Sequence, residues 1–391
     1  MDVDQIAFEV ANSELAQAVS WVARKLPSNP AQPVLKGIRI VAEDDVLEIS
    51  GYDYEVSNLV RIPADVESPG KIALAGKLLS DITSNLPKET VKFDCDGSLI
   101  TVDCGSAHFE LPAIPIDDYP ALPVLPEPTG SVDPQGFAWA IQQVAVAASN
   151  DDALPMLTGI YIAITGDEML LATTDRFRMA VRKLSWNALD KTLDTQLLVP
   201  AKTLLDSSKT LSSASSEDVV LAVSDAEQGH RLLGLQSGDR KTSTRLIDAE
   251  YPNFRPLLPE RHTATATVAI DQLLQAVKRV SLVADSAGQI RLQFTDGELI
   301  ISAGGADAGK AQESIPCAFF GDTIVTAFRT QYLREGLQVM ASDRVFFGFT
   351  EPHRPVLLAP QPEELPEQTE DGFFPAPQTD FQYVLMPVRT S

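Results

Sequence analysis

The stretch from Leu170 to Val181, LLATTDRFRMAV, places one carboxylate and two guanidinium groups where an apolar run ends. The charged residues are Asp175, Arg176 and Arg178. Side chains of these types could serve catalysis, phosphate binding or peptide docking, or they could form only a charged turn. General acid–base catalysis would require a histidine or a second carboxylate close by, and the stretch contains neither. We therefore expect Asp175 to organise a turn.

The rest of the sequence also lacks the patterns of a catalytic site. There is no glycine-rich loop of the Walker or dinucleotide type, and GGADAG at 304–309 lacks the lysine and the spacing that such a loop requires. The four histidines are scattered, without a pair at i and i+4 that could bind a metal. We predict a protein that is not an enzyme, with no cofactor and no metal, although an enzyme with an unrecognised site stays open as an alternative.

Length and composition indicate a folded protein of several domains. A chain of 391 residues exceeds one ordinary core, and 44% apolar residues is typical of globular chains. No apolar run is long enough for a membrane span, and we expect no secretory signal. Three cysteines without metal-ligand spacing indicate buried, reduced thiols and a cytoplasmic location. The net charge of −23, taken alone, argues against nucleic-acid binding.

The chain contains three copies of one repeated unit. The segments ELAQAVSWVARKL, GFAWAIQQVAVAA and QLLQAVKRVSLVA each place apolar residues at i, i+4 and i+7, as one face of an amphipathic helix does. Each is followed by a strand hairpin, a second helix and further strand pairs. We therefore predict an α+β protein of three repeated domains, each with two helices packed on antiparallel sheets. Proline-rich stretches give boundaries at 1–128, 129–258 and 259–391, and the acidic, proline-rich stretch 359–378 is expected to be a solvated loop.

Charge is distributed unevenly over this repeat. The six predicted helices span 13–26, 75–86, 134–149, 200–211, 270–284 and 328–340. They carry nine basic and five acidic side chains, a net charge of +4, whereas the rest of the chain carries −27. Helices that all face one way would form a mildly basic surface, which suits duplex DNA held without base-specific contacts. The basic side chains predicted to face DNA are Arg24, Lys25, Lys77, Lys202, Lys209, Lys278, Arg279, Arg329 and Arg334.

Several stretches, in this order, resemble the bacterial DNA polymerase III β subunit, the sliding clamp, and most closely its actinobacterial form. They are WVARKLP, GYDYEVS, LLSDITSNLP, DDYPALPVLPEPTG, DDALPMLTGI, TTDRFRMAVR, LLVPAKTLLD, TRLIDAEYPNFRPLLP and YVLMPVR. The resemblance implies the DNA-clamp fold and a head-to-tail homodimeric ring whose helices line a hole around duplex DNA. It also implies a non-catalytic subunit of the polymerase III holoenzyme. Its expected partners are the replicative polymerase α subunit, a clamp loader and other proteins with clamp-binding motifs, but no membrane.

The same resemblance assigns a peptide-binding pocket and a dimer interface. In the pocket, apolar side chains would form a floor for leucine or phenylalanine of a partner peptide, and arginines at the rim would orient it. The pocket residues are Leu157, Thr174, Arg176, Phe177, Arg178, Met179, Pro252, Leu257, Val384, Leu385, Met386, Pro387, Val388 and Arg389. The interface would place Phe109 and Leu111 on an exposed edge strand against Leu282 of the partner.

The sequence departs from the family pattern at several places, among them Asn29 and Asn150, where some relatives carry arginine. Arg329-Thr330 stands where many relatives have an asparagine–proline pair, and Arg176-Phe177 replaces a glycine–histidine pair found in some bacteria. Two alternatives to the housekeeping clamp therefore stay open. One is a specialised second copy with altered ligand or DNA binding, and the other is a non-catalytic scaffold for protein docking. Strand alternation alone leaves the orientation of Phe177 and Met179 undecided.

Overall fold

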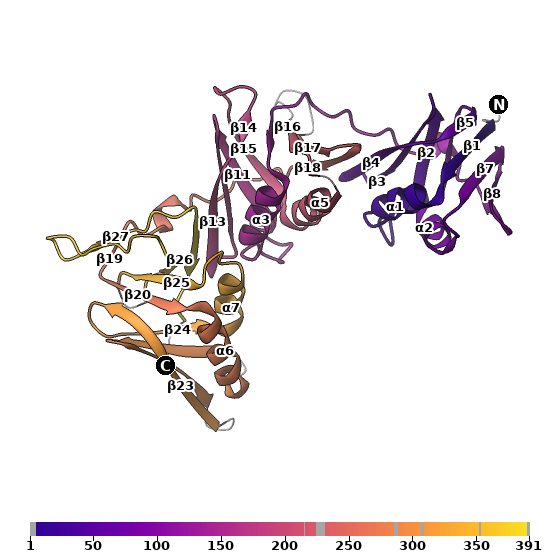
Figure 1. Cartoon of the computed structure of the whole chain (residues 1–391). Coiled ribbons are helices and arrows are strands. Elements are labelled where there is room, and N and C mark those ends of the chain that lie inside the picture. The colour runs from indigo at the N-terminus through magenta and orange to yellow at the C-terminus, as the bar shows by residue number, and fades with distance from the viewer. Residues whose placement is uncertain are drawn as a thin grey trace. The chain divides into compact units, whose positions relative to one another are not determined.

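The structure is a computed structural model, and it describes residues 5–214, 216–223, 231–284, 288–305, 309–351 and 353–388. The chain forms two compact units (Figure 1). Unit 1 comprises Met1–Pro134 and Lys209–Leu246, and unit 2 comprises Gln135–Ser208 and Ile247–Ser391. The predicted central repeat is therefore shared between the two units.

Unit 1 contains two antiparallel sheets. The first has the strand order β5-β1-β7-β8-β9, and its strands are Asp65–Ser68, Gln5–Ala11, Thr90–Asp96, Leu99–Cys104 and Ala107–Pro112. The second runs β10-β16-β17-β18-β4-β3-β2-β6, and its strands are Gly130–Val132, Val219–Val223, Leu232–Ser237, Arg240–Arg245, Val56–Pro63, Val46–Tyr52, Gly37–Glu43 and Gly70–Ala75. In β7 every second residue is buried, so Val91, Phe93 and Cys95 face the core.

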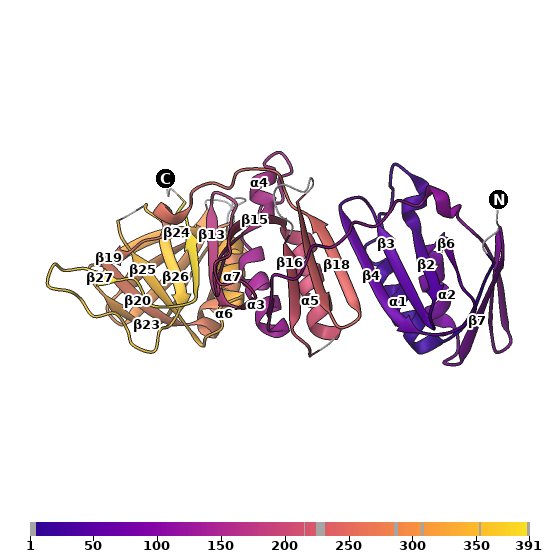
Figure 2. The same ribbon diagram turned by 90° about the horizontal axis from the view of Figure 1, so that it is seen from above.

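Two helices cover one sheet of unit 1. They are α1 (Asn12–Ala23) and α2 (Gly76–Asn85), which lie side by side along β2, β3, β4 and β6 (Figure 2). The apolar face that the sequence predicts for α1 is buried at Leu15, Val19 and Val22. Two short 3-10 helices complete the unit, Pro33–Lys36 (η1) and Ile116–Asp118 (η2).

Unit 2 is built on one twelve-stranded sheet with the order β15-β11-β12-β13-β28-β26-β25-β20-β23-β22-β21-β24. In that order the strands are Asp194–Pro200, Gly159–Thr165, Glu168–Thr174, Arg178–Ser185, Phe381–Leu385, Val356–Pro360, Arg344–Phe349, Ala264–Ala269, Gly309–Phe320, Glu298–Gly305, Gln289–Thr295 and Ile324–Arg329. A separate two-stranded ladder joins β19 (Arg261–His262) to β27 (Phe374–Pro375), and β14 is Asn187–Ala188.

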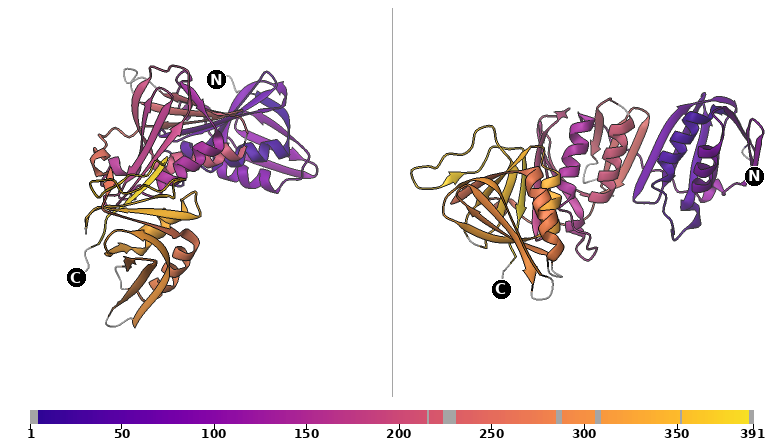
Figure 3. Two further views of the ribbon diagram at one scale, coloured as in Figure 1. Left: turned by 60° about the vertical axis from the view of Figure 1, so that its left-hand side comes forward. Right: turned by 60° about the horizontal axis from the view of Figure 1, so that its bottom comes forward.

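The helices of the second and third repeats keep the predicted pattern. They are α3 (Pro134–Ala145), α4 (Pro155–Thr158), α5 (Ala201–Ala214), α6 (Ile270–Val280) and α7 (Thr330–Gln338), with the 3-10 helices η3 (Arg255–Leu257) and η4 (Ser281–Val283). In unit 2, α6 and α7 lie side by side on the sheet (Figure 3). All six predicted helices are confirmed, and the predicted α+β class with them. The four-residue α4 was not predicted from the sequence.

Other expectations concern cysteines, membrane spans and metals. Cys95, Cys104 and Cys317 are free and buried, as predicted. Over the described ranges, no helix combines the length and the apolar character that crossing a bilayer requires. The same ranges hold no group of three or more metal-binding side chains.

The repeats are joined by strand pairing at two equivalent places. In unit 1, β18 of the second repeat pairs antiparallel with β4 of the first. In unit 2, β28 of the third repeat pairs antiparallel with β13 of the second. We call the β4–β18 pair the first junction and the β13–β28 pair the second junction. Each junction joins the third strand after a repeat's first helix to the last strand of the next repeat.

Candidate functional site

The stretch that follows β12 is a tight turn built around Asp175. Its Oδ1 accepts hydrogen bonds from the backbone N–H groups of Phe177 and Arg178, each at 3.0 Å. The Thr174 hydroxyl accepts one from the Arg176 N–H at 3.1 Å and donates one to the Arg178 carbonyl at 2.8 Å. This confirms the prediction that Asp175 organises the turn. We call residues 175–178 the second turn, because it leads into the second junction.

Arg176 occupies the left-handed backbone region, with φ of 76°. At this position an arginine bears the steric cost of a Cβ atom, which a glycine would avoid. Because the chain reverses at Arg176, β13 begins only at Arg178. Phe177 therefore belongs to the turn and is 44% exposed, whereas Met179 belongs to the strand and is 3% exposed. The two side chains do not share a face, which resolves the orientation left open above.

Arg178 lies in the interior of unit 2 rather than at a pocket rim. Its Nε donates to Asp175 at 3.0 Å, and its Nη1 pairs with the Glu335 carboxylate and lies 3.4 Å from the Tyr383 hydroxyl. The guanidinium also stacks on the Tyr332 ring, 4.3 Å from its centre. Burial alone would lower the pKa of Arg178, but Tyr383, Glu335 and Asp175 raise it overall, so the side chain stays charged. Because Arg178 is buried and its Nε and Nη1 are engaged inside unit 2, the expectation that it orients a bound peptide from the pocket rim is corrected.

Three of the expected pocket side chains form an exposed apolar surface near the second turn. Phe177, Leu257 and Met386 are 44%, 50% and 41% exposed. Arg176 and Pro252 are exposed as well, and Pro387 and Val388 are half-buried. The other described members are buried: Leu157, Thr174, Arg178, Met179, Val384 and Leu385. Arg389 lies outside the described residues.

Side chains from the segments of this surface pack together in a small buried cluster. It contains Met179 of β13, Val384 of β28 and Phe254 from the segment before η3, with Tyr251 and Leu258 packed against it. At the end of the second junction, the Met386 N–H donates to the Phe177 carbonyl at 2.9 Å. The sequence therefore assembles an apolar surface from three segments that are far apart along the chain.

Arg329 lies beside this apolar surface. Its guanidinium is 5.0 Å from the centre of the Phe177 ring and 5.6 Å from that of Tyr332. The two rings stack on each other with centroids 6.4 Å apart. A cation over aromatic faces is held by the ring quadrupole. Arg329, predicted to face DNA, is thus placed with the predicted peptide pocket.

The remaining basic residues differ in their surroundings. Seven are exposed on or next to helices: Arg24, Lys77, Lys202, Lys209, Lys278, Arg279 and Arg334. Lys25 is half-buried. Arg279 is committed to a bidentate ion pair, with its Nε 2.9 Å from the Glu313 carboxylate. Its positive charge is therefore largely offset before any phosphate approaches.

The predicted interface residues are not equally exposed. Leu282 in η4 is 84% exposed, whereas Leu111 in β9 is 7% exposed and belongs to the core of unit 1. Phe109 is half-buried and packs against the same core. The expectation of two exposed apolar side chains on β9 is therefore corrected. Strand alternation turns both residues towards the core and leaves His108 and Glu110 exposed.

Comparisons with known proteins give matches to all three repeats. The family models of the DNA polymerase III beta subunit match at residues 6–123 for its N-terminal domain, 131–253 for its central domain and 255–370 for its C-terminal domain. The crystal structure of the DNA polymerase sliding clamp from Bacillus subtilis superposes with a TM-score of 0.90 at 25% identity, covering 99% of this chain and 100% of that one. The fold is therefore that of the sliding clamps.

Two relatives narrow the assignment. The beta sliding clamp of Streptomyces coelicolor is 41% identical over 382 residues, which is 98% of this chain and 99% of that protein. The beta sliding clamp homolog GriR of Streptomyces muensis is 39% identical over the same lengths. The chain belongs to the DNA polymerase III beta subunit family, the bacterial beta sliding clamps, and is of the actinobacterial type. This confirms the resemblance inferred from the sequence.

Three residues of the site were missed from the sequence. Tyr332 and Glu335 present the ring and the carboxylate that hold Arg178, and Tyr383 adds its hydroxyl. Tyr332 and Glu335 are three residues apart on α7 and so share a helix face. The spacing of these two residues could therefore have been recognised in the sequence. Glu335, however, lies 157 residues from Arg178 in the sequence, and no local pattern predicts the pairing.

Proposed function

We propose that this chain acts as a DNA sliding clamp that encircles duplex DNA as a homodimeric ring and tethers the replicative polymerase. In this role it is a non-catalytic subunit of the polymerase III holoenzyme and works in the cytoplasm, on the nucleoid. We propose the domain division 1–128, 129–258 and 259–391, which the three family matches support. The observation that carries the ring is the pairing rule of the two junctions.

By that rule, one strand of the first repeat and one strand of the third repeat have no partner within the chain. In both junctions, the third strand after a repeat's first helix pairs with the last strand of the next repeat. Among the described residues, β9, the last strand of the first repeat, pairs only with β8. The stretch 309–314 of β23, the third strand of the third repeat, pairs only with β22. Unpaired strand edges call for a partner.

A second copy of the chain supplies that partner. If β23 of one protomer pairs with β9 of the next by the same rule, the contact is head-to-tail, and a head-to-tail contact whose rotation closes gives a ring. Leu282 in η4 lies next to β23 in the fold and is 84% exposed. We propose that it packs against the β9 edge of the partner subunit, where Phe109 and Leu111 sit in the strand.

The apolar surface at the second turn is the proposed docking site for partner peptides. Phe177, Leu257 and Met386 offer apolar contact area, and Arg176 and Arg329 supply cations at its edge. A peptide with leucine or phenylalanine anchors and an acidic residue fits this combination. The proposed users are the α subunit of the polymerase, a clamp loader and other proteins with clamp-binding motifs.

The exposed basic residues on the helices are the proposed DNA-facing surface. Their weak positive charge on an otherwise acidic protein suits a duplex that is held topologically and left free to slide. Arg279 and Arg329 contribute least to this surface, because Glu313 and the aromatic rings already engage them.

Sedimentation tests the closed ring. We expect a mass of about twice 42.3 kDa for the unmodified chain. Leu282→Asp should yield monomers, because it buries an unpaired carboxylate in the proposed interface. Leu189→Asp is the matched control: Leu189 is 73% exposed outside that interface and should leave the dimer intact. A monomeric unmodified chain, or equal effects of the two substitutions, would refute the proposed ring.

A further inference from the structure

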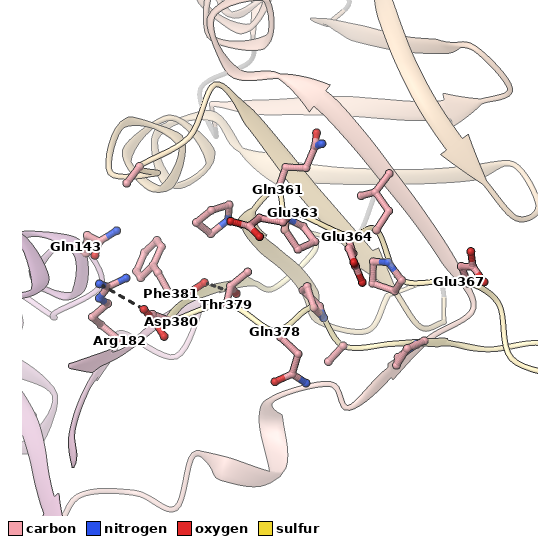
Figure 4. Close-up of a pocket in the computed structure, with 18 residues that line it drawn as sticks. Gln143, Arg182, Gln361, Glu363, Glu364, Glu367, Gln378, Thr379, Asp380 and Phe381 are labelled. Atoms are coloured by element: carbon pink, nitrogen blue, oxygen red, sulfur yellow. Dashed lines mark hydrogen bonds and ion pairs between the residues drawn. The ribbon is translucent and has the colours of Figure 1, made fainter. Parts of the chain in front are cut away.

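Unit 2 also contains a hollow, which lies at the end of the second junction farthest from the second turn. It has a volume of about 1240 Å³ and is lined by Gln143, Arg182 and residues of the segment between β26 and β28 (Figure 4). The paired strands run from Arg178, opposite Leu385, to Arg182, opposite Phe381. Four residues of strand cover roughly 13 Å. The hollow, which we call the acidic groove, is therefore separate from the proposed docking site.

The outer wall of the acidic groove is a proline-rich segment held in place at its base. Phe374 is buried and pairs with His262 in the β19–β27 ladder, and a turn closes where the Gly372 N–H donates to the Thr369 carbonyl at 2.9 Å. Five prolines line the groove: Pro360, Pro362, Pro366, Pro375 and Pro377. Proline has no N–H, so this wall offers carbonyl oxygens and ring faces. Both suit an extended chain that brings its own donors.

The acidic groove is negatively charged, which favours a positively charged ligand. Glu363, Glu364, Glu367 and Asp380 line it, against the single cation of Arg182. The three glutamates are exposed, and no ion pair joins them to another side chain in the described parts of the chain. Such a wall repels nucleic-acid phosphates and attracts lysine and arginine.

The inner end of the groove carries an unpaired acceptor and an unpaired donor. Gln143 is fully buried, and its Nε2 donates to the Val339 carbonyl at 2.9 Å, which leaves Oε1 without a partner. Arg182 Nε is unpaired as well, and the guanidinium is held only loosely by Asp380 at 3.9 Å. Figure 4 shows both side chains reaching this end of the groove. One acceptor beside one donor is the complement of a backbone peptide group.

We propose that the acidic groove docks an extended, lysine- or arginine-containing peptide segment of a partner protein. A backbone amide of the peptide satisfies Gln143 and Arg182, its cations lie against the glutamates, and its backbone follows the proline wall. This gives unit 2 a second docking surface, with the opposite charge preference to the one at the second turn.

Fluorescence anisotropy with the full chain tests this proposal. The probe is a short fluorescein-labelled peptide of alternating lysine and proline, and the comparison probe alternates glutamate and proline. The lysine probe should bind more tightly. The triple variant Glu363→Gln, Glu364→Gln, Glu367→Gln should weaken it by about tenfold at physiological salt. The control variant Glu43→Gln, Glu127→Gln, Asp322→Asn removes the same charge elsewhere and should leave binding unchanged.

A further variant separates a built site from a diffuse negative charge. Arg182→Lys keeps the positive charge but removes the Nε donor, and should weaken the lysine probe by about threefold; a thermal melt checks that the variant is folded. An excess of unlabelled polymerase-tail peptide should not displace the probe. Equal effects of the two triple variants, an unchanged affinity for Arg182→Lys, displacement by the tail peptide, or no preference for the lysine probe would each overturn the proposal.

Discussion

Two turns of the molecule share one backbone frame and differ in what they expose. In unit 1, Asp53 Oδ1 accepts hydrogen bonds from the N–H groups of Glu55 and Val56, and Tyr54 has φ of 73°. In unit 2, Asp175 caps Phe177 and Arg178 in the same way, and Arg176 has φ of 76°. We call residues 53–56 the first turn, because it leads into the first junction.

The correspondence extends across the junctions. The Glu55 carbonyl accepts from the Arg245 N–H, and the Phe177 carbonyl accepts from the Met386 N–H, each at 2.9 Å. In the first turn these two positions carry opposite charges and form an ion pair, with Arg245 Nη1 3.3 Å from Glu55. In the second turn they are an exposed phenylalanine and methionine. The same backbone turn therefore carries an ion pair in the first repeat and exposed apolar side chains in the second.

The residues that follow differ too. The first junction is sealed by short neutral groups, since Ser57 faces Ser243 at 2.7 Å and Thr242 donates to Asn58 at 2.9 Å, all of them buried. The second junction begins with the buried charge of Arg178. The comparison teaches that a few side chains decide whether this repeated turn presents a charged or an apolar face, because the backbone of the two turns is the same.

The largest expected effect comes from removing the buried charge. Arg178→Met leaves Asp175 and Glu335 without their cation, and breaking a buried pair in this way costs about 3–5 kcal/mol. Urea unfolding should show that loss. Arg176→Ala, on the exposed neighbour, should change the free energy of unfolding by less than about 0.5 kcal/mol. Similar values for the two variants would contradict the structural role of Arg178.

Converting the second turn into the first should abolish peptide docking. Phe177→Glu with Met386→Arg installs the ion pair of the first turn and removes two apolar contacts, each worth about 1.5 kcal/mol or more. Affinity for a polymerase-tail peptide should fall by about a hundredfold, with little change in the melting temperature. Calorimetric titration measures the affinity. A variant that still binds as the unmodified chain does would break the comparison.

Acid should weaken unit 2 through one buried histidine. His262 is fully buried, with no described hydrogen-bond partner on either ring nitrogen, and burial lowers its pKa to about 4. An unfolded histidine titrates near 6.5, so between pH 6.5 and 4 only the unfolded chain binds this proton. Stability therefore falls as the pH drops through that window, by up to about 3 kcal/mol. Urea unfolding at pH 7 and pH 4.5 measures the loss.

His262→Phe is the control for this pH dependence. It keeps a ring in the same buried site and removes the titrating group, so the free energy of unfolding should fall less between the two pH values. An identical loss in the unmodified chain and the variant would assign the acid sensitivity to other groups.

The smallest expected effect concerns Arg329. Arg329→Ala removes the cation over Phe177 and Tyr332, and a cation–π contact at an exposed site is worth about 0.5–1 kcal/mol. Affinity for an acidic tail peptide should drop by about threefold to fivefold. Arg334→Ala removes an exposed arginine four residues into α7 and should leave peptide affinity unchanged. If Arg334→Ala had the larger effect, Arg329 would not belong to the docking surface.

Much of this could be predicted from the sequence. The apolar spacing gave the helices, because one face of each helix is buried on a sheet in every repeat. Asp175 was readable because a carboxylate that follows a strand is well placed to cap a turn. The family resemblance supplied the candidate site residues, which no local pattern provides.

The rest depended on contacts between distant segments. The left-handed Arg176 ends the strand alternation, so the exposure of Phe177 could not be counted along the chain. The role of Arg178 depends on Glu335 and Tyr383, which meet it only after the third repeat has folded against β13. From the sequence, Leu111 is expected to be an exposed residue of an edge strand. In the structure β9 pairs with β8, and Leu111 faces the core.

The most direct test of the encircling ring is retention on DNA of defined topology. The chain is loaded onto a nicked circular plasmid by a clamp loader with ATP, separated from free protein, and followed before and after a restriction enzyme linearises the plasmid. A closed ring should stay on the circle and slide off the linear form through its free ends. Equal retention on both forms would show that contact energy, and not encirclement, holds the protein on DNA.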